Sequence, residues 1–131
     1  MEKLTIHSSK RIELIDITSK LIEKIEGKIE DGIVICYNPH TTAGLLINEH
    51  ADPDVAYDIE NFLLRLIPHN FNFTHSEGNS DAHIKSVITG NQLCLIVEKG
   101  KIQLGRWQGI FFAEYDGPRT REIWIKFLQE R

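Results

Sequence analysis

Hydrophobic and polar residues along this 131-residue chain alternate with a period of two in some stretches and follow helical spacing in others. Near the N-terminus, alternation at residues 3–8 and 11–15 predicts two short strands that pair with each other. Apolar runs predict further strands, the first of them buried on both faces, at residues 33–37, 45–47, 93–97, 110–115 and 119–127.

Helical spacing of hydrophobic residues predicts three helices between these strands, at residues 16–27, 52–68 and 82–89. The second is the clearest, because Asp52 and Pro53 supply a cap and a first-turn proline and Pro68 ends it. Its hydrophobic stripe is expected to face the core and comprises Val55, Ile59, Phe62, Leu63 and Leu66. The length fits one domain, residues 1–131, with a core of its own.

Composition narrows the class of protein. The chain has 15 basic and 19 acidic residues, a net charge of −4, and no cluster of Lys or Arg that would follow a phosphate backbone, so we expect no nucleic-acid partner. Cys36 and Cys94 lie inside apolar runs, where cysteine acts as a small buried hydrophobe with a reduced thiol. The sequence shows no signal peptide and no membrane-spanning run, which predicts a cytoplasmic protein without a membrane partner.

Candidate chemistry is densest at residues 75–83, where His75, Glu77, Asp81 and His83 surround a Gly-Asn-Ser turn. Imidazole and carboxylate groups bind divalent metals and exchange protons near neutral pH. His75 and His83 can meet if the loop folds back, so we predict a metal held by both, with Asp81 or a distant acid completing the set. The alternative is an ordinary helix start, with Asn79 or Ser80 as the cap.

Two further groups of polar residues follow predicted strands. His40, Thr41 and Thr42 form a corner where a rigid scaffold commonly displays a site; the alternative is that these hydroxyls satisfy a local turn. Strand alternation also places Glu114 and Asp116 on one face, near Arg119 and Arg121 across the Gly-Pro turn. This cluster is either an ion-pair network that fixes the hairpin or a clamp for a phosphate or carboxylate.

Together, these segments resemble the YjbQ family from about residue 3 to the C-terminus. The matching segments are His40 to Ala43, Ile47 to Glu49, Asp52 to Asp54, Glu77 to His83, G-R-W-Q-G-I at 105–110 and E-Y-D-G-P-R at 114–119. The resemblance implies an α+β fold of packed, mostly antiparallel β-sheets, sandwich-like, with two to three helices. It also implies a homotrimer and, in some members, a bound metal. Gly44 and Arg106 depart from the usual family pattern, and Arg106 leaves the detail of the pocket open.

The family resemblance further implies thiamine-phosphate synthase activity, which joins an aminopyrimidine diphosphate to a thiazole phosphate and releases diphosphate. Such chemistry needs Mg²⁺ or arginines to neutralise diphosphate, so Asp81, Glu114 and Asp116 are expected to bind the ion, with Arg119 on phosphate and Trp107 stacked on the ring. The full expected catalytic set is His40, Asp81, His83, Glu114 and Asp116. The expected substrate-binding set is Thr41, Thr42, Asn48, Glu49, Asn79, Trp107, Gln108 and Arg119.

A different class of function uses the same residues. In that alternative, the chain is a metal-dependent binding or regulatory module that holds a small phosphorylated or anionic molecule without converting it. A third alternative is a structural Zn²⁺ or other divalent ion that fastens the trimer.

Overall fold

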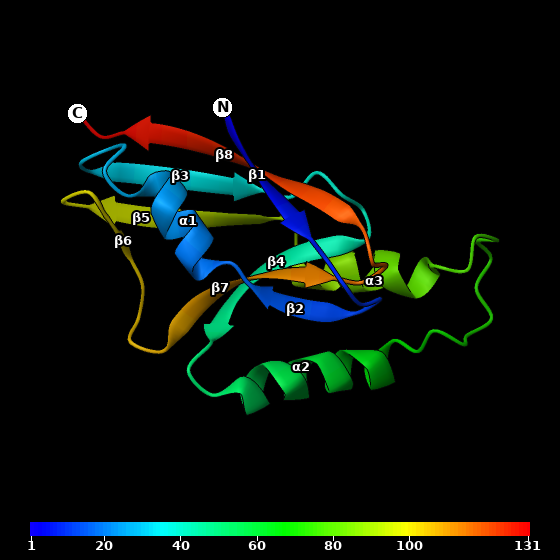
Figure 1. The fold of residues 1–131 in the computed structure, drawn as a ribbon. Helices are drawn as coiled ribbons and strands as arrows, with labels where there is room; N and C mark the ends of the chain where they lie inside the picture. Colours follow the sequence, from blue (N-terminus) through cyan, green and yellow to red (C-terminus); the bar gives the residue numbers. More distant parts are fainter.

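A computed structural model describes residues 1–131 as two antiparallel sheets and three helices (Figure 1). The five-stranded sheet has the order β1 (Glu2–His7), β8 (Thr120–Gln129), β3 (Gly32–Tyr37), β5 (Gln92–Glu98), β6 (Lys101–Gln103). The three-stranded sheet has the order β2 (Glu13–Asp16), β7 (Gln108–Glu114), β4 (Ala43–Glu49). The predicted α+β class with mostly antiparallel sheets is confirmed.

The main core lies between the inner face of the five-stranded sheet, one face of the three-stranded sheet and helix α1 (Thr18–Ile25). Strand alternation turns Val34 and Cys36 of β3 inward, and α1 adds Leu21 and Ile25 from one helical stripe. Each of these side chains is fully buried, and full burial of an aliphatic side chain of this size contributes roughly 1.5–3 kcal/mol. This core fixes the position of both sheets.

Helices α2 (Pro53–Leu66) and α3 (Ser80–Thr89) cover the other face of the three-stranded sheet, where α2 contacts β2 and α3 contacts β4. A smaller cluster joins Leu63 of α2, Ala82 of α3, Ala113 of β7 and Tyr115. Burial raises the pKa of Tyr115 to about 12, and its hydroxyl donates to Thr89 Oγ1 at 3.2 Å. The two helices are therefore held on the same sheet face.

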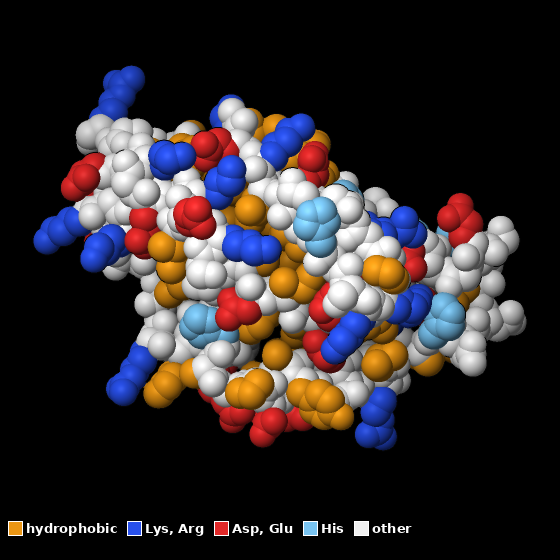
Figure 2. Space-filling view, viewed as in Figure 1, with side chains coloured by type: hydrophobic (Ala, Val, Ile, Leu, Met, Phe, Trp, Pro, Cys, Tyr) orange, Lys and Arg blue, Asp and Glu red, His pale blue; other side chains and the backbone are white.

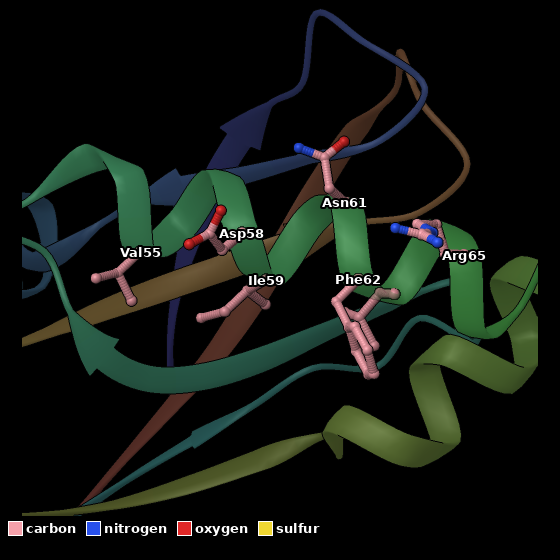
Figure 3. Close-up of a pocket in the computed structure, with 7 residues that line it drawn as sticks. Val55, Asp58, Ile59, Asn61, Phe62 and Arg65 are labelled. Carbon is pink, nitrogen blue, oxygen red and sulfur yellow. The ribbon is translucent and has the colours of Figure 1, made fainter.

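The prediction that the whole apolar stripe of α2 is core was wrong. Only Leu63 is buried, while Phe62 is 65% exposed and Leu66 is 56% exposed. Val55, Ile59 and Phe62 project from the same side of α2 and line an open cavity of about 640 Å³ (Figure 3). Figure 2 shows hydrophobic side chains gathered on the outer surface of α2. The apolar stripe of α2 is wider than the surface that the three-stranded sheet offers it, so only the centre of the stripe is buried.

Two predictions about the strands were also wrong. The first two strands do not pair: β1 pairs with β8 and β2 with β7, because each finds a partner about a hundred residues away in the other half of the chain. Residues 33–37 are buried on one face only, with Ile33 41% exposed, and Cys94 is also exposed. No helix covers the outer face of the five-stranded sheet in Figure 1. An apolar run in the sequence does not show whether one or both faces of its strand are buried.

None of the three helices is long and apolar enough to cross a bilayer.

Candidate functional site

Two of the predicted histidines lie on one cavity of about 440 Å³. His40 and Thr41 come from the turn between β3 and β4, and His83 comes from the first half of α3. The remaining lining residues are Ser86, Val87, Gly90 and Asn91, from the end of α3 and the turn after it. The structure therefore brings together two polar segments that are 43 positions apart in the sequence.

The His40 imidazole has a defined tautomer. Its Nε2 accepts a hydrogen bond from the backbone N–H of Glu122 at 3.0 Å, so the ring hydrogen of the neutral form is on Nδ1. Burial and the nearby Arg121 guanidinium lower the pKa of His40. Asn38 stabilises the turn, since its Oδ1 accepts a hydrogen bond from the His40 backbone N–H at 2.9 Å. His40 is thus neutral at pH 7, with Nδ1–H as its free donor.

His83 differs from His40 because no group of the chain forms a hydrogen bond with its ring. The ring of His75 stands edge-on to it at a centroid distance of 5.5 Å. His83 and His75 also line a second cavity of about 400 Å³ beside the first. The predicted approach of His75 to His83 is therefore present, and His83 lies between the two cavities.

The carboxylate of Asp81 is fully buried and bonded to three basic side chains. Arg11 donates two hydrogen bonds at 3.2 and 3.1 Å, Lys85 donates one at 3.0 Å, and His69 Nδ1 lies 3.2 Å from Oδ1. Burial by itself would raise the pKa of Asp81, but the hydrogen bonds from these three groups outweigh it and hold the pKa well below its ordinary value. Asp81 therefore joins α3 to the segments that carry Arg11 and His69.

This environment decides whether the predicted metal fits. No group of three or more His, Cys, Asp or Glu side chains is arranged to hold an ion. His75 and His83 would be two ligands, but the oxygens of Asp81 are already shared by three basic groups. The residues present do not fit a metal held by His75, His83 and Asp81.

Glu114 is the second fully buried carboxylate. Both of its oxygens contact the Arg121 guanidinium, and Ser8 Oγ donates to it at 2.6 Å. Arg121 also donates to Thr42 Oγ1 at 2.9 Å. The Thr42 hydroxyl, which was expected to bind substrate, is therefore hydrogen-bonded within the chain. Burial would raise the pKa of Glu114, but the Arg121 and Ser8 bonds lower it below its ordinary value. This arrangement matches the ion-pair alternative.

Asp116 lies at the rim of the same cluster. Asn79 Nδ2 donates to Asp116 Oδ2 at 3.0 Å, and Arg119, whose side chain is 52% exposed, donates to the same oxygen at 3.1 Å. Burial alone would raise the pKa of Asp116, but the bonds from Asn79 and Arg119 lower it. Asn79, Asp116 and Arg119 are thus brought together, but none of them lines the His40 cavity.

The other four predicted binding residues lie elsewhere. In the pairing of β4 with β7, Ala43 is opposite Glu114, whereas Asn48 is opposite Gly109 and Glu49 opposite Gln108. Six residues of strand separate these ends, about 20 Å at the usual rise. Trp107, 54% exposed, immediately precedes Gln108 at the start of β7. Asn48, Glu49, Trp107 and Gln108 therefore do not share the His40 cavity.

Sequence reasoning missed Ser86 and Asn91 as lining residues. Ser86 is three positions after His83, so the helical period puts both on one side of α3. That signal was readable once the helix was predicted. Asn91 lines the same cavity because it is bonded to the turn that carries His40. The backbone N–H of Asn38 donates to the Asn91 carbonyl oxygen at 2.7 Å. A contact between segments so far apart in sequence has no local signal.

Comparison with known proteins identifies the family of this fold and site. The model of the family described as "UPF0047 protein YjbQ-like" matches residues 2–130. The chain belongs to the YjbQ family. A UPF0047 protein of Methanocaldococcus jannaschii is 57% identical over 130 residues, which cover 98% of this chain and 94% of that protein. The UPF0047 protein YugU of Bacillus subtilis is 45% identical over 130 residues, 98% of each chain.

Solved YjbQ-family structures have the same fold. A crystal structure from Clostridium acetobutylicum superposes with a TM-score of 0.91 at 41% identity, covering 98% of this chain and all of that one. A structure from Sulfolobus solfataricus superposes with a TM-score of 0.93 at 29% identity, covering 98% of this chain and 96% of that one.

The predicted thiamine-phosphate synthase activity is wrong. The UPF0047 relatives are named only by their family, and the Sulfolobus structure is described as a "YbjQ-like protein of unknown function". The alternative of a metal-dependent binding module gains no support from the structure, in which no group of three metal ligands is found.

Proposed function

We propose that the cavity between His40 and His83 binds a small anionic molecule, such as a phosphate or carboxylate compound, and exchanges a proton with it. The observation that carries this proposal is that two imidazoles of different hydrogen-bonding state line one cavity of about 440 Å³. That volume fits a small molecule.

The residues that line the cavity indicate the charge of the ligand. None of the seven lining residues carries a carboxylate, so the cavity wall holds no negative charge to attract a cation. The side chains of Thr41 and Asn91 make no hydrogen bond within the chain, and both can donate. His40 adds Nδ1–H. Several donors around a cavity without acids favour an anion.

The two histidines take different roles in this proposal. His40 is held neutral, and its Nε2 is occupied by the Glu122 backbone amide, so it acts as a hydrogen-bond donor toward the ligand. The ring of His83 has no hydrogen bond within the chain, so it can accept a proton and return it. Asp81 and Glu114 act as the rigid support behind the cavity, because their oxygens are already bonded.

Imidazole NMR titration with inorganic phosphate and with acetate tests the proposal, with tetramethylammonium as the cation of comparison. We expect both anions to shift the ring resonances of His40 and His83, and the cation to shift neither. Replacing His83 by Asn removes one charge-assisted bond, worth about 1.5–3 kcal/mol, and should weaken phosphate binding about tenfold or more.

The matched control is His7→Asn, because His7 is exposed on β1 and bonds only to Thr120. This variant should bind phosphate as the parent does. Ring shifts at His40 and His83 no larger than those at His7 would overturn the proposal.

We also propose that the chain assembles as a homotrimer through the outer face of the five-stranded sheet. Ile33 lies beside both Ile96 and Leu128 in the strand register, and these side chains are 41%, 56% and 50% exposed. A contiguous apolar surface of this kind is typical of a subunit contact.

Sedimentation equilibrium tests the trimer, with Ile96→Glu compared with Leu66→Glu. Both parent side chains are 56% exposed, but Leu66 lies on α2. Ile96→Glu should reduce the mass to that of one chain, and Leu66→Glu should leave a trimer. The reverse result would place the contact on α2 and contradict the proposal.

A further inference from the structure

At the end of the three-stranded sheet opposite His40, His50 lies beside the carboxylate of Asp16. Register puts Asp16 of β2 opposite Phe111 of β7, and Asn48 of β4 opposite Gly109. Residues opposite each other share a face, and so do alternate residues of one strand, so Asp16, Asn48 and Gly109 lie on the same face. His50 follows β4 directly, and its backbone N–H donates to Trp107 O at 3.1 Å.

The His50 imidazole crosses the central strand of this sheet. It begins on the β4 edge and reaches Asp16 on the β2 edge, with its Nδ1 2.8 Å from Asp16 Oδ2. The crossing depends on Gly109, because a β-carbon at position 109 would overlap the Cβ, Cγ and Nδ1 atoms of His50. A glycine in the middle strand therefore provides the space that the ring occupies.

The Asp16 carboxylate is fixed before it meets His50. Its Oδ1 accepts from the Thr18 backbone N–H at 3.0 Å and from Thr18 Oγ1 at 2.6 Å, at the start of α1. Burial would raise the pKa of Asp16, but the bonds from Thr18 and His50 lower it below its ordinary value. An ionised carboxylate accepts a hydrogen bond and donates none, so it selects the His50 tautomer with hydrogen on Nδ1.

That tautomer leaves the Nε2 lone pair of His50 open. No hydrogen bond from the chain reaches Nε2, and the side chain is 33% exposed. Trp107 lies at the same end of the sheet, 54% exposed, with the Arg106 guanidinium carbon 4.9 Å from the centre of its ring. An oriented imidazole with one bare nitrogen beside an exposed aromatic ring is an arrangement suited to proton removal.

We propose that His50 and Asp16 form a general-base pair at a second site, which acts on the hydroxyl of a small molecule or on water. The Nε2 lone pair takes the proton, the oxygen keeps the electron pair of the broken O–H bond, and the Asp16 carboxylate stabilises the resulting imidazolium. Trp107 offers a flat surface for the rest of the molecule. This inference goes beyond the function proposed for the His40 cavity and does not depend on it.

The test measures the reactivity of each histidine toward diethyl pyrocarbonate at pH 7, read residue by residue by mass spectrometry. The bare Nε2 attacks a carbonyl carbon, a C–N bond forms, and ethyl carbonate leaves. We expect His50 to react faster than the exposed His7, and Asp16→Asn to slow His50 about tenfold while His7 is unchanged. Asn keeps an oxygen for Thr18, so the start of α1 is preserved.

Gly109→Ala provides a second approach, because the added methyl group moves the His50 ring away from Asp16 without changing either polar group. It should slow His50 as Asp16→Asn does. If this variant fails to fold, the Asp16→Asn comparison still decides the matter. The proposal is overturned if His50 in the parent reacts no faster than His7, or if Asp16→Asn leaves its rate unchanged; the pair would then be a tie between strands.

Discussion

The polar groups that line the His40 cavity and those behind it differ in how fully they are hydrogen-bonded. Behind the His40 cavity, the buried carboxylates of Asp81 and Glu114 have every oxygen bonded to a basic or hydroxyl group. Inside the cavity, His83 makes no hydrogen bond with the chain, and His40 uses only one ring nitrogen. Around the His40 cavity, the acids whose oxygens are already bonded therefore belong to the scaffold, whereas unbonded donors and acceptors form the surface available to a ligand.

Glu114→Gln should have the largest effect on stability. The change leaves the Arg121 guanidinium buried without its counter-charge, and removing one partner of a buried pair costs about 3–5 kcal/mol. We expect the free energy of unfolding, measured by urea denaturation, to fall by that amount. Glu23→Gln on the exposed side of α1 is the control and should change it by less than about 0.5 kcal/mol. A loss below about 1 kcal/mol for Glu114→Gln would show that the pair is not part of the scaffold.

Acid should weaken the same region next. The pKa values of Asp81 and Glu114 lie below their ordinary values of 3.8 and 4.5, so the unfolded chain takes up protons before the folded one does. Their stabilisation is complete above about pH 5–6, begins to fall as the pH drops through these ordinary values, and is lost only once the pH has passed the lower folded-state pKa values; the loss is on the order of 2 kcal/mol for one such carboxylate. Urea denaturation at pH 7, 5, 4 and 3 measures it. Equal stability at pH 7 and pH 3 would contradict the assignment.

His40→Asn should affect both the stability of the protein and ligand binding. The change removes the Nε2 acceptor of the Glu122 backbone N–H, and an unsatisfied amide costs about 1–3 kcal/mol. We expect an intermediate loss in the free energy of unfolding, together with weaker phosphate binding. Unchanged stability would mean that the Glu122 amide finds another acceptor.

His83→Asn should have the smallest effect on stability. The ring makes no hydrogen bond within the chain, so we expect the free energy of unfolding to change by less than about 0.5 kcal/mol. Phosphate binding should nevertheless fall, which separates a ligand contact from a structural one. A loss of stability comparable to that of His40→Asn would place His83 in the scaffold instead.

The sequence predicted the elements better than their partners. Helical spacing located α2 and α3 to within about two residues, because capping residues and prolines act locally. The pairing of β1 with β8 had no local signal, since it joins residues such as Leu4 and Ile123. The outer exposure of Ile33 was missed for the same reason: whether a second layer covers a sheet depends on the whole chain.

The candidate site shows the same limit. His40 and His83 were both expected site residues, and the structure places them on one cavity. Asp81 was expected to bind a metal, although Lys85 four positions later was a readable sign of an ion pair. His50 was overlooked because its partner Asp16 lies 34 positions away on another strand. Residue type identifies candidate groups, but only tertiary structure shows whether their lone pairs are already in use.

The strand order has a consequence for how the molecule is made. β7 is the middle strand of its sheet, and β8 is the only partner of β1 and also pairs with β3. Neither sheet can close until residues 108–129 have left the ribosome, so β1 and β2 wait unpaired through most of synthesis. Open strand edges favour aggregation, so this chain is most exposed to it before its last two strands emerge.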